Sequence, residues 1–160
     1  MVRKILWLYV GTALLGTAWH FLYPWVPIPL VGLIAPVNES VWEHLKLLFW
    51  PFLFASPWIA AMAPRKQQGW GGCLAALLFM PVLLLGVYYP GVAGFGIRTE
   101  AFPVVLYYAV LAAGFFLAYR LRSSTAIGDW AGTLLMGVGF YCACLVVFSL
   151  AAPPLQIFQG

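Results

Sequence analysis

The chain has 160 residues, of which 64% are hydrophobic and 8% are charged, and its formal net charge is +4. Soluble domains contain roughly 45–50% apolar and about 25% charged residues. The composition therefore excludes an ordinary water-soluble domain and indicates an integral membrane protein of one domain, residues 1–160. The few basic residues lie at the ends of apolar runs rather than on one polar surface, so we expect no nucleic-acid partner.

Five apolar runs are long enough to cross a membrane, whose hydrocarbon core of about 30 Å takes about 20 helical residues. An open sheet cannot survive in lipid, and the runs lack the alternation of barrel strands. The sequence therefore predicts an all-α fold, an integral membrane five-helix bundle. The expected spans are residues 5–23, 41–63, 70–89, 101–119 and 130–151.

Basic residues predict the orientation of these spans. Three basic pairs lie on the side of the membrane where the chain begins: Arg3 and Lys4, Arg65 and Lys66, and Arg120 and Arg122. The opposite side holds only Lys46 and Arg98. Because basic residues concentrate in cytoplasmic loops, we expect a cytoplasmic N-terminus and an extracytoplasmic C-terminus. The lipid bilayer is the expected partner, with basic pairs against anionic headgroups.

The connection between the first two runs, residues 24–39, has four prolines yet is largely apolar. Proline lacks a backbone N–H, which disfavours a continuous helix here. Exposed irregular backbone is not tolerated in hydrocarbon, so this segment is expected in the interface or as a re-entrant loop. It would cover the outer helix ends.

Polar residues gather at one depth on this outer side. Helix two is expected to begin near Ser40, which places His44 in its first turn, and His20 lies near the outer end of helix one. At 1.5 Å per residue, both imidazoles lie roughly 6 Å below the outer boundary. Polar groups at membrane depth are costly, so a cluster suggests mutual pairing or a ligand. The candidate ligand-binding residues are His20, Asn38, Glu39, Ser40, Glu43, His44 and Lys46.

A helical wheel divides this cluster. With 100° per residue, Glu39, Glu43 and Lys46 fall within about 60° of one another, and His44 points about 100° away from Glu43. His44 is then free to face His20. Two imidazoles and a carboxylate hold catalytic zinc in other proteins and leave a position for water. The sequence therefore offers His20, Glu43 and His44 as ligands for a divalent metal such as zinc.

A purely structural interpretation explains part of the same motif. Ser40 and Glu43 have the spacing of a capping box, which satisfies free amides at a helix start. Lys46 can pair with Glu43 or Glu39. In this interpretation the motif only begins helix two and fixes its contact with helix one.

Tyrosines cluster on the same outer side, at Tyr88, Tyr89, Tyr107 and Tyr108. Tyrosine is common at membrane interfaces, where its polar tip faces water. These residues are expected either to anchor the helices in the interface or to line the site beside His20.

Four stretches carry a resemblance: HFLYPW at 20–25, VGL at 31–33, PVNESVWEHLKLLFWP at 36–51 and YYPGVAGFG at 88–96. Together they resemble a family of small bacterial multi-pass membrane proteins of unknown function. The resemblance implies a place in the bacterial cytoplasmic membrane and brings no activity with it.

Two shorter stretches resemble families of known function, and each suggests a class of function for this chain. SVWEHL at 40–45 is similar to a stretch of progestin and adiponectin receptor-like proteins, whose superfamily includes intramembrane zinc hydrolases. That likeness implies a metal-dependent hydrolase acting on a lipid-like substrate, with Glu39 or Glu43 as general base. WHFLYPWVPIP at 19–29 is similar to tryptophan-rich sensory proteins, which bind porphyrins and sterols.

Three functions therefore stay open at this stage. The outer-facing residues His20, Glu39, Glu43 and His44 are expected to bind a small ligand or cation. The alternatives are an intramembrane metal-dependent hydrolase and a structural or assembly protein. The sequence leaves the ligand, catalysis and oligomeric state undetermined.

Overall fold

The computed structural model describes residues 2–158, and within that range every regular element is a helix. This confirms the all-α fold. The elements are α1 (Val2–Trp19), α2 (Leu22–Trp25), α3 (Pro29–Gly32), α4 (Val41–Ala60), α5 (Lys66–Tyr89), a π-helical turn (Pro90–Gly94), α6 (Ala101–Leu121), α7 (Thr125–Asp129), α8 (Ala131–Leu150) and a 3-10 turn (Gln156–Phe158).

One long helix overlaps each of the five predicted apolar runs. Three stretches are long and apolar enough to cross a membrane, Lys66–Gly94, Ala101–Leu121 and Ala131–Leu150. The other two long helices carry charge, since α1 begins with basic residues and α4 contains Glu43 and Lys46. That α1 and α4 also span the membrane stays a prediction.

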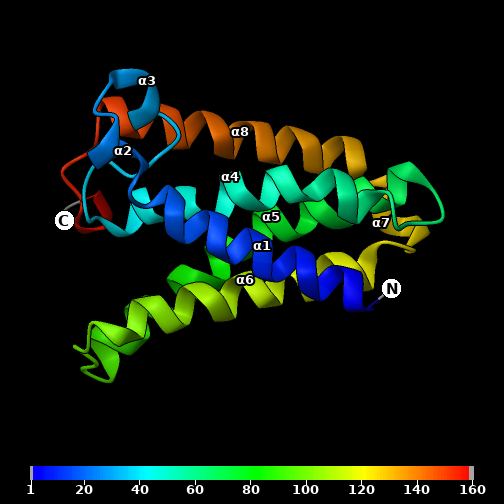
Figure 1. The fold of residues 1–160 in the computed structure, drawn as a ribbon, viewed down its shortest axis with the longest axis horizontal. Coiled ribbons are helices and arrows are strands. Elements are labelled where there is room, and N and C mark those ends of the chain that lie inside the picture. Colours follow the sequence, from blue (N-terminus) through cyan, green and yellow to red (C-terminus); the bar gives the residue numbers. More distant parts are fainter. Residues whose placement is uncertain (1, 159–160) are drawn as a thin grey trace.

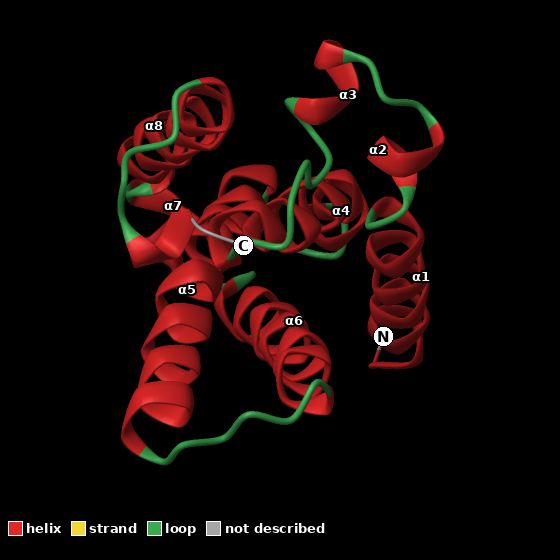
Figure 2. Ribbon diagram, turned by 90° about the vertical axis from the view of Figure 1, so that its left-hand side faces the viewer, coloured by secondary structure: helices red, strands yellow, loops and turns green. Residues whose placement is uncertain are grey.

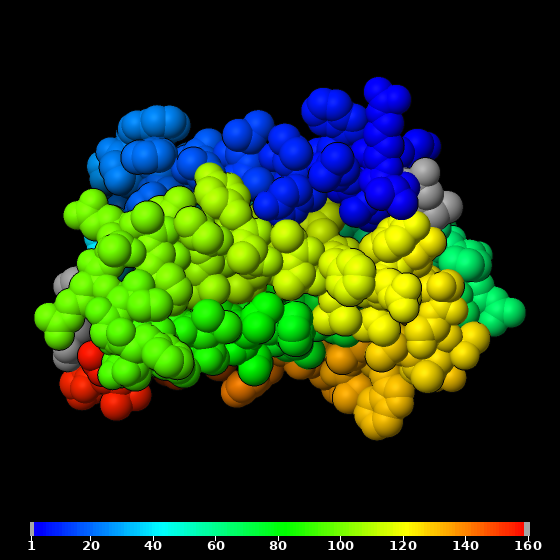
Figure 3. All heavy atoms as spheres, turned by 90° about the horizontal axis from the view of Figure 1, so that it is seen from below, coloured from blue at the N-terminus to red at the C-terminus, as the bar shows by residue number. Residues whose placement is uncertain are grey.

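The long helices lie side by side around α5. Helix α5 contacts α4, α6, α7 and α8, and α1 packs on α4 and α6. In the end-on view, α1 and α8 lie on either side of α4 (Figure 2). The face seen from below shows α6 between α1 and α5 (Figure 3). Phe52 of α4 meets Phe115 of α6 edge-on in the buried core, with ring centroids 5.1 Å apart.

The outer part of the first predicted span differs from expectation. Helix α1 ends at Trp19, before the predicted residue 23, and His20 lies just beyond its last turn. The Phe21 amide bonds to the Ala18 carbonyl three residues back, which tightens the chain, and Pro24 has no N–H with which to continue the helix. The chain then turns through α2 and α3, which the sequence did not predict.

The two ends of the bundle carry different residues (Figure 1). The start of α1, the α4–α5 connection and the α6–α7 connection lie together at one end, and these segments carry the three predicted basic pairs. The other end, here called the α2–α3 end, carries α2, α3, the start of α4 and the α5–α6 connection. The predicted orientation requires all three basic pairs to lie at the same end of the protein, and they share this end.

Gly16 is a point of close approach between helices. A Cβ built on it would overlap the Tyr107 hydroxyl and lie 3.1 Å from the Leu47 carbonyl oxygen. We expect Gly16→Ala to lower the free energy of unfolding by about 1–3 kcal/mol, because overpacking forces neighbours apart. Gly11→Ala on the same helix is the control, since nothing lies within 4 Å of its Cβ position. Thermal unfolding in detergent measures both; equal melting temperatures would contradict the close contact.

Candidate metal site and cavity

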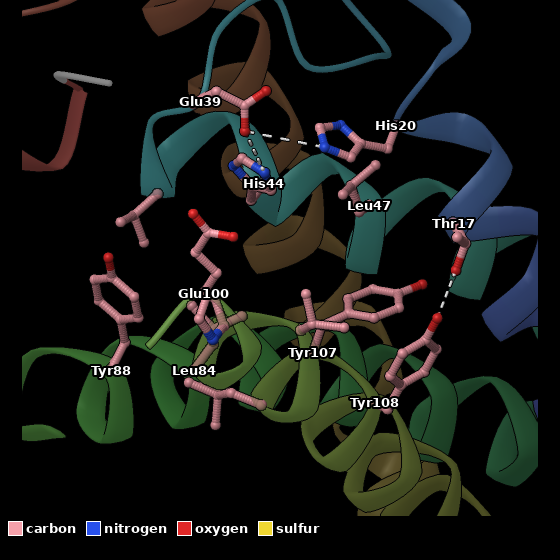
Figure 4. A pocket seen from close by; sticks show the side chains of 15 residues that line it. Thr17, His20, Glu39, His44, Leu47, Leu84, Tyr88, Glu100, Tyr107 and Tyr108 are labelled. Carbon is pink, nitrogen blue, oxygen red and sulfur yellow. Dashed lines mark hydrogen bonds and ion pairs between the residues drawn. The ribbon is translucent and has the colours of Figure 1, made fainter. Parts of the chain in front are cut away.

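Two histidines and a glutamate meet where α1 ends and α4 begins. His20 follows α1, His44 lies in the first turn of α4, and Glu39 precedes the cap of α4. One Glu39 carboxylate oxygen, Oε2, lies 3.4 Å from His44 Nε2 and 3.9 Å from His20 Nε2 (Figure 4). The centroids of the two imidazole rings are 5.2 Å apart. The juxtaposition of His20 and His44 expected from their depth is therefore present.

The orientation of His44 is fixed by the backbone of its own helix. His44 Nδ1 lies 2.8 Å from the Ser40 carbonyl oxygen. A carbonyl only accepts, so Nδ1 carries the proton, and in the neutral ring Nε2 presents a lone pair. That lone pair faces a carboxylate oxygen, which is also an acceptor. Such a pairing requires a proton or a cation between the two atoms.

The spacing of the three groups suits a small metal ion. Ligand atoms about 2.1 Å from a tetrahedral metal lie about 3.4 Å from one another. The His44–Glu39 separation of 3.4 Å equals that edge, and the His20–Glu39 separation of 3.9 Å exceeds it by an amount that a side-chain rotation removes. One ligand atom from each of the three residues lies within 4.8 Å of the others.

His20 is the less constrained of the two imidazoles. Its Nδ1 is buried and has no hydrogen-bond partner among the described residues. The ring is tilted against Phe21, with centroids 5.3 Å apart. The side chains of His20 and His44 are about one-third exposed, and that of Glu39 is 74% exposed. The group is therefore accessible to an incoming ion.

Glu43 lies elsewhere and belongs to a buried network instead. Its Oε2 accepts from Lys46 Nζ at 2.7 Å and from the Val37 amide at 2.9 Å, and its Oε1 accepts from Ser149 Oγ at 2.8 Å. The predicted ligand set of His20, Glu43 and His44 is thus not brought together, because Lys46 and Ser149 engage both Glu43 oxygens. Glu39 takes its place beside the imidazoles.

Lys46 joins the connection of residues 24–39, here called the lid segment, to α4. Its side chain is completely buried, and besides Glu43 its Nζ donates to the Gly32 carbonyl at 2.6 Å and to the Ala35 carbonyl at 3.2 Å. All three ammonium protons therefore have acceptors. Lys46 neither pairs with Glu39 nor reaches outward; it fixes the segment after α3 against α4.

The predicted capping box is half formed. Ser40 is the N-cap of α4, and its hydroxyl accepts from the Glu43 amide at 3.3 Å. The Ser40 amide donates to Asn38 Oδ1 at 2.9 Å, so Asn38 rather than the Glu43 carboxylate completes the cap. The motif thus divides in two: Asn38, Ser40, Glu43 and Lys46 build the structure, while Glu39 and His44 turn outward with His20.

A cavity of about 380 Å³ opens beside the His20–Glu39–His44 group. All three residues contribute to its wall, and Glu100 and Tyr107 face it from α6 (Figure 4). The remaining lining is mostly apolar. It comprises Gly16, Thr17, Val41, Leu47, Leu84, Tyr88, Pro103, Val104, Leu106 and Tyr108.

Three of the four outer tyrosines line this cavity, namely Tyr88, Tyr107 and Tyr108. The Tyr108 hydroxyl lies 2.9 Å from Thr17 Oγ1, whereas the buried Tyr107 hydroxyl has no hydrogen-bond partner among the described residues. Sequence reasoning did not identify Glu100, Thr17 or Ser149 as neighbours of the motif. Glu100 stood out only as a charged residue in an apolar chain; Thr17 and Ser149 carried no signal.

These features define an all-helical protein with at least three helices able to cross a membrane and with a His–Glu–His group that can hold a metal ion. Residues 2–160 match a family described as "Family of unknown function (DUF6512)", and the chain belongs to that family. No curated protein and no solved structure matches the chain.

Proposed function

We propose that this protein binds a divalent transition metal, with zinc as the first candidate, through His20, Glu39 and His44. One observation carries the proposal: with Nδ1 turned to the Ser40 carbonyl, His44 Nε2 faces the Glu39 carboxylate at 3.4 Å, the separation of two ligands on one tetrahedral ion. The bond from Nδ1 to the Ser40 carbonyl supports it further. Metal-bound histidines usually donate their second ring N–H to such an acceptor.

We further propose that the site lies at the outer surface of the bacterial cytoplasmic membrane, with five spanning helices. The basic pairs supply the support, because they share the end of the bundle opposite the metal group. By the positive-inside rule that end is cytoplasmic. A cysteine introduced at Ser124 should then react only with membrane-permeant thiol reagents in whole cells, and one at Asn38 also with impermeant ones. The reverse pattern would contradict this orientation.

The metal proposal is favoured over a purely structural role for the motif. Capping and the Lys46–Glu43 network account for Asn38, Ser40, Glu43 and Lys46. They leave the Glu39 and His20 side chains without a structural task, since Glu39 is 74% exposed and the His20 imidazole makes no other hydrogen bond or ion pair among the described residues.

Metal-dependent hydrolysis is the second candidate function. Two nitrogens and one carboxylate oxygen leave a tetrahedral position open, and the three residues border the cavity. Zinc in such a position makes a bound water nucleophilic at neutral pH. Glu100, which borders the same cavity and is not one of the three proposed ligands, is a candidate for a general base.

Elemental analysis of protein purified without added metal tests the metal proposal. We expect about one zinc per chain, removable by a strong chelator and restored by added zinc. As a control, a His20→Ala/His44→Ala double variant purified in the same way should retain less than about a tenth of this metal. Wild-type protein that holds no transition metal, even after zinc is supplied, would overturn the proposal.

A further inference from the structure

We propose that the cavity binds the hydrocarbon chain of a single-chain amphiphile, a medium-chain fatty acid, whose carboxylate lies at the His20–Glu39–His44 group. This inference rests on the metal proposed above. It assigns a ligand to the cavity, which the metal site alone does not identify.

The cavity has the lining of a chain-binding site. Most of its wall comes from aliphatic and aromatic side chains, including Leu47, Leu84 and Leu106. Ligand cavities range from about 300 to 1,000 Å³, and 380 Å³ lies near the lower limit. That space suits one slender chain and not a two-chain phospholipid.

The cavity also extends along α6. Its α6 lining runs from Glu100 to Tyr108, which at 1.5 Å per residue is about 12 Å. The polar group lies on the side of α1 and α4, and the tyrosines of α6 lie on the facing side (Figure 4). A largely apolar space with its polar group on one side matches a molecule that has a head group and a chain.

We place the route of entry where α1 and α6 are least tied to each other. Tyr108 joins the two helices twice, through its hydroxyl to Thr17 and through its carbonyl to the Tyr9 hydroxyl. Toward the α2–α3 end, beyond Thr17, the described residues show no hydrogen bond between α1 and α6. Val104 borders the cavity there and is 54% exposed. An apolar opening at this depth admits a molecule sideways from the outer leaflet.

The charges at the mouth make binding depend on the metal. Glu39 and Glu100 both border the cavity, so an anionic head group would meet two carboxylates. Like charges repel unless a cation lies between them. A bound metal supplies that cation and leaves a coordination position for the carboxylate. A fatty alcohol of the same length lacks the anion and should bind without this dependence.

Photo-crosslinking tests the inference, with a diazirine-bearing decanoic acid as the probe and zinc-loaded protein in lipid nanodiscs. We expect labelling of cavity residues, reduced at least about tenfold in Val104→Trp, because the indole fills the opening. Val105→Trp is the matched control, since Val105 is 64% exposed and does not line the cavity. Zinc content is measured on every sample, and normal zinc in Val104→Trp shows that it is folded.

The outcomes separate the two proposals. Labelling lost on chelation and in Val104→Trp, but kept in Val105→Trp, supports the inference. Normal zinc with no labelling, or equal labelling of both tryptophan variants, overturns the inference and leaves the metal site intact. Labelling that persists in the chelated protein overturns the proposed position of the head group, and absence of zinc from all samples overturns the metal site itself.

Discussion

Lys46→Met is expected to lower the free energy of unfolding by about 3–5 kcal/mol, the usual cost of removing one partner of a buried ion pair. The ammonium is completely buried and bonds to Glu43, 2.7 Å away, and to two carbonyls of the lid segment. Methionine keeps the length of the side chain but leaves the Glu43 carboxylate without its cation. Denaturant unfolding in mixed micelles measures the loss.

The double variant Glu43→Gln/Lys46→Met is the control for this effect. Removing both charges abolishes the uncompensated carboxylate, so it should be more stable than Lys46→Met alone. Limited proteolysis adds a local readout. Cleavage between residues 24 and 39 should rise in Lys46→Met, because Gly32 and Ala35 lose their common donor. A single variant as stable as the wild type would show that the network does not hold the lid.

The long helices were predictable because each is encoded locally. Apolar runs of the required length give helices whose ends fall within a few residues of the predicted ones, as for the run 101–119 and the observed Ala101–Leu121. The short elements were not predictable in this way. Helix α7 has five residues and depends on Ser124, whose hydroxyl accepts from the Ile127 amide at 3.3 Å, a signal too short to separate from a loop.

The sequence predicted how deep the candidate site residues lie below the membrane surface. It did not predict in which direction each side chain points around its helix. Counting residues from the helix ends brought His20 and His44 together, and the structure does the same. The helical wheel correctly placed Glu43 beside Lys46 but misplaced Glu39, because Ser40 has extended backbone, with ψ of 152°, and Glu39 does not follow the 100° spacing. Ser149 donates a hydrogen bond to the second Glu43 oxygen from more than 100 residues away in the sequence, so no local pattern predicts this contact.

Glu39→Gln and Glu43→Gln are expected to have opposite effects, although both replace a carboxylate with an amide in the same motif. Glu39→Gln should weaken zinc binding by at least about 100-fold, since changes to outer-shell partners alone cost about 10–100-fold. Its stability without metal should stay within about 0.5 kcal/mol of the wild type, because the side chain is 74% exposed. His44→Ala should lose zinc in the same way.

Glu43→Gln should lose stability, because its buried carboxylate accepts from Lys46, Val37 and Ser149, and folded protein that remains should keep its zinc. Chelator competition measures zinc affinity, and thermal unfolding of metal-free protein measures stability. Asp129→Asn is the control, since this exposed carboxylate lies on α7, at the opposite end of the bundle. If both glutamine variants lost zinc and stability together, the motif would act as one structural unit, and the division into a buried network and a metal group would be wrong.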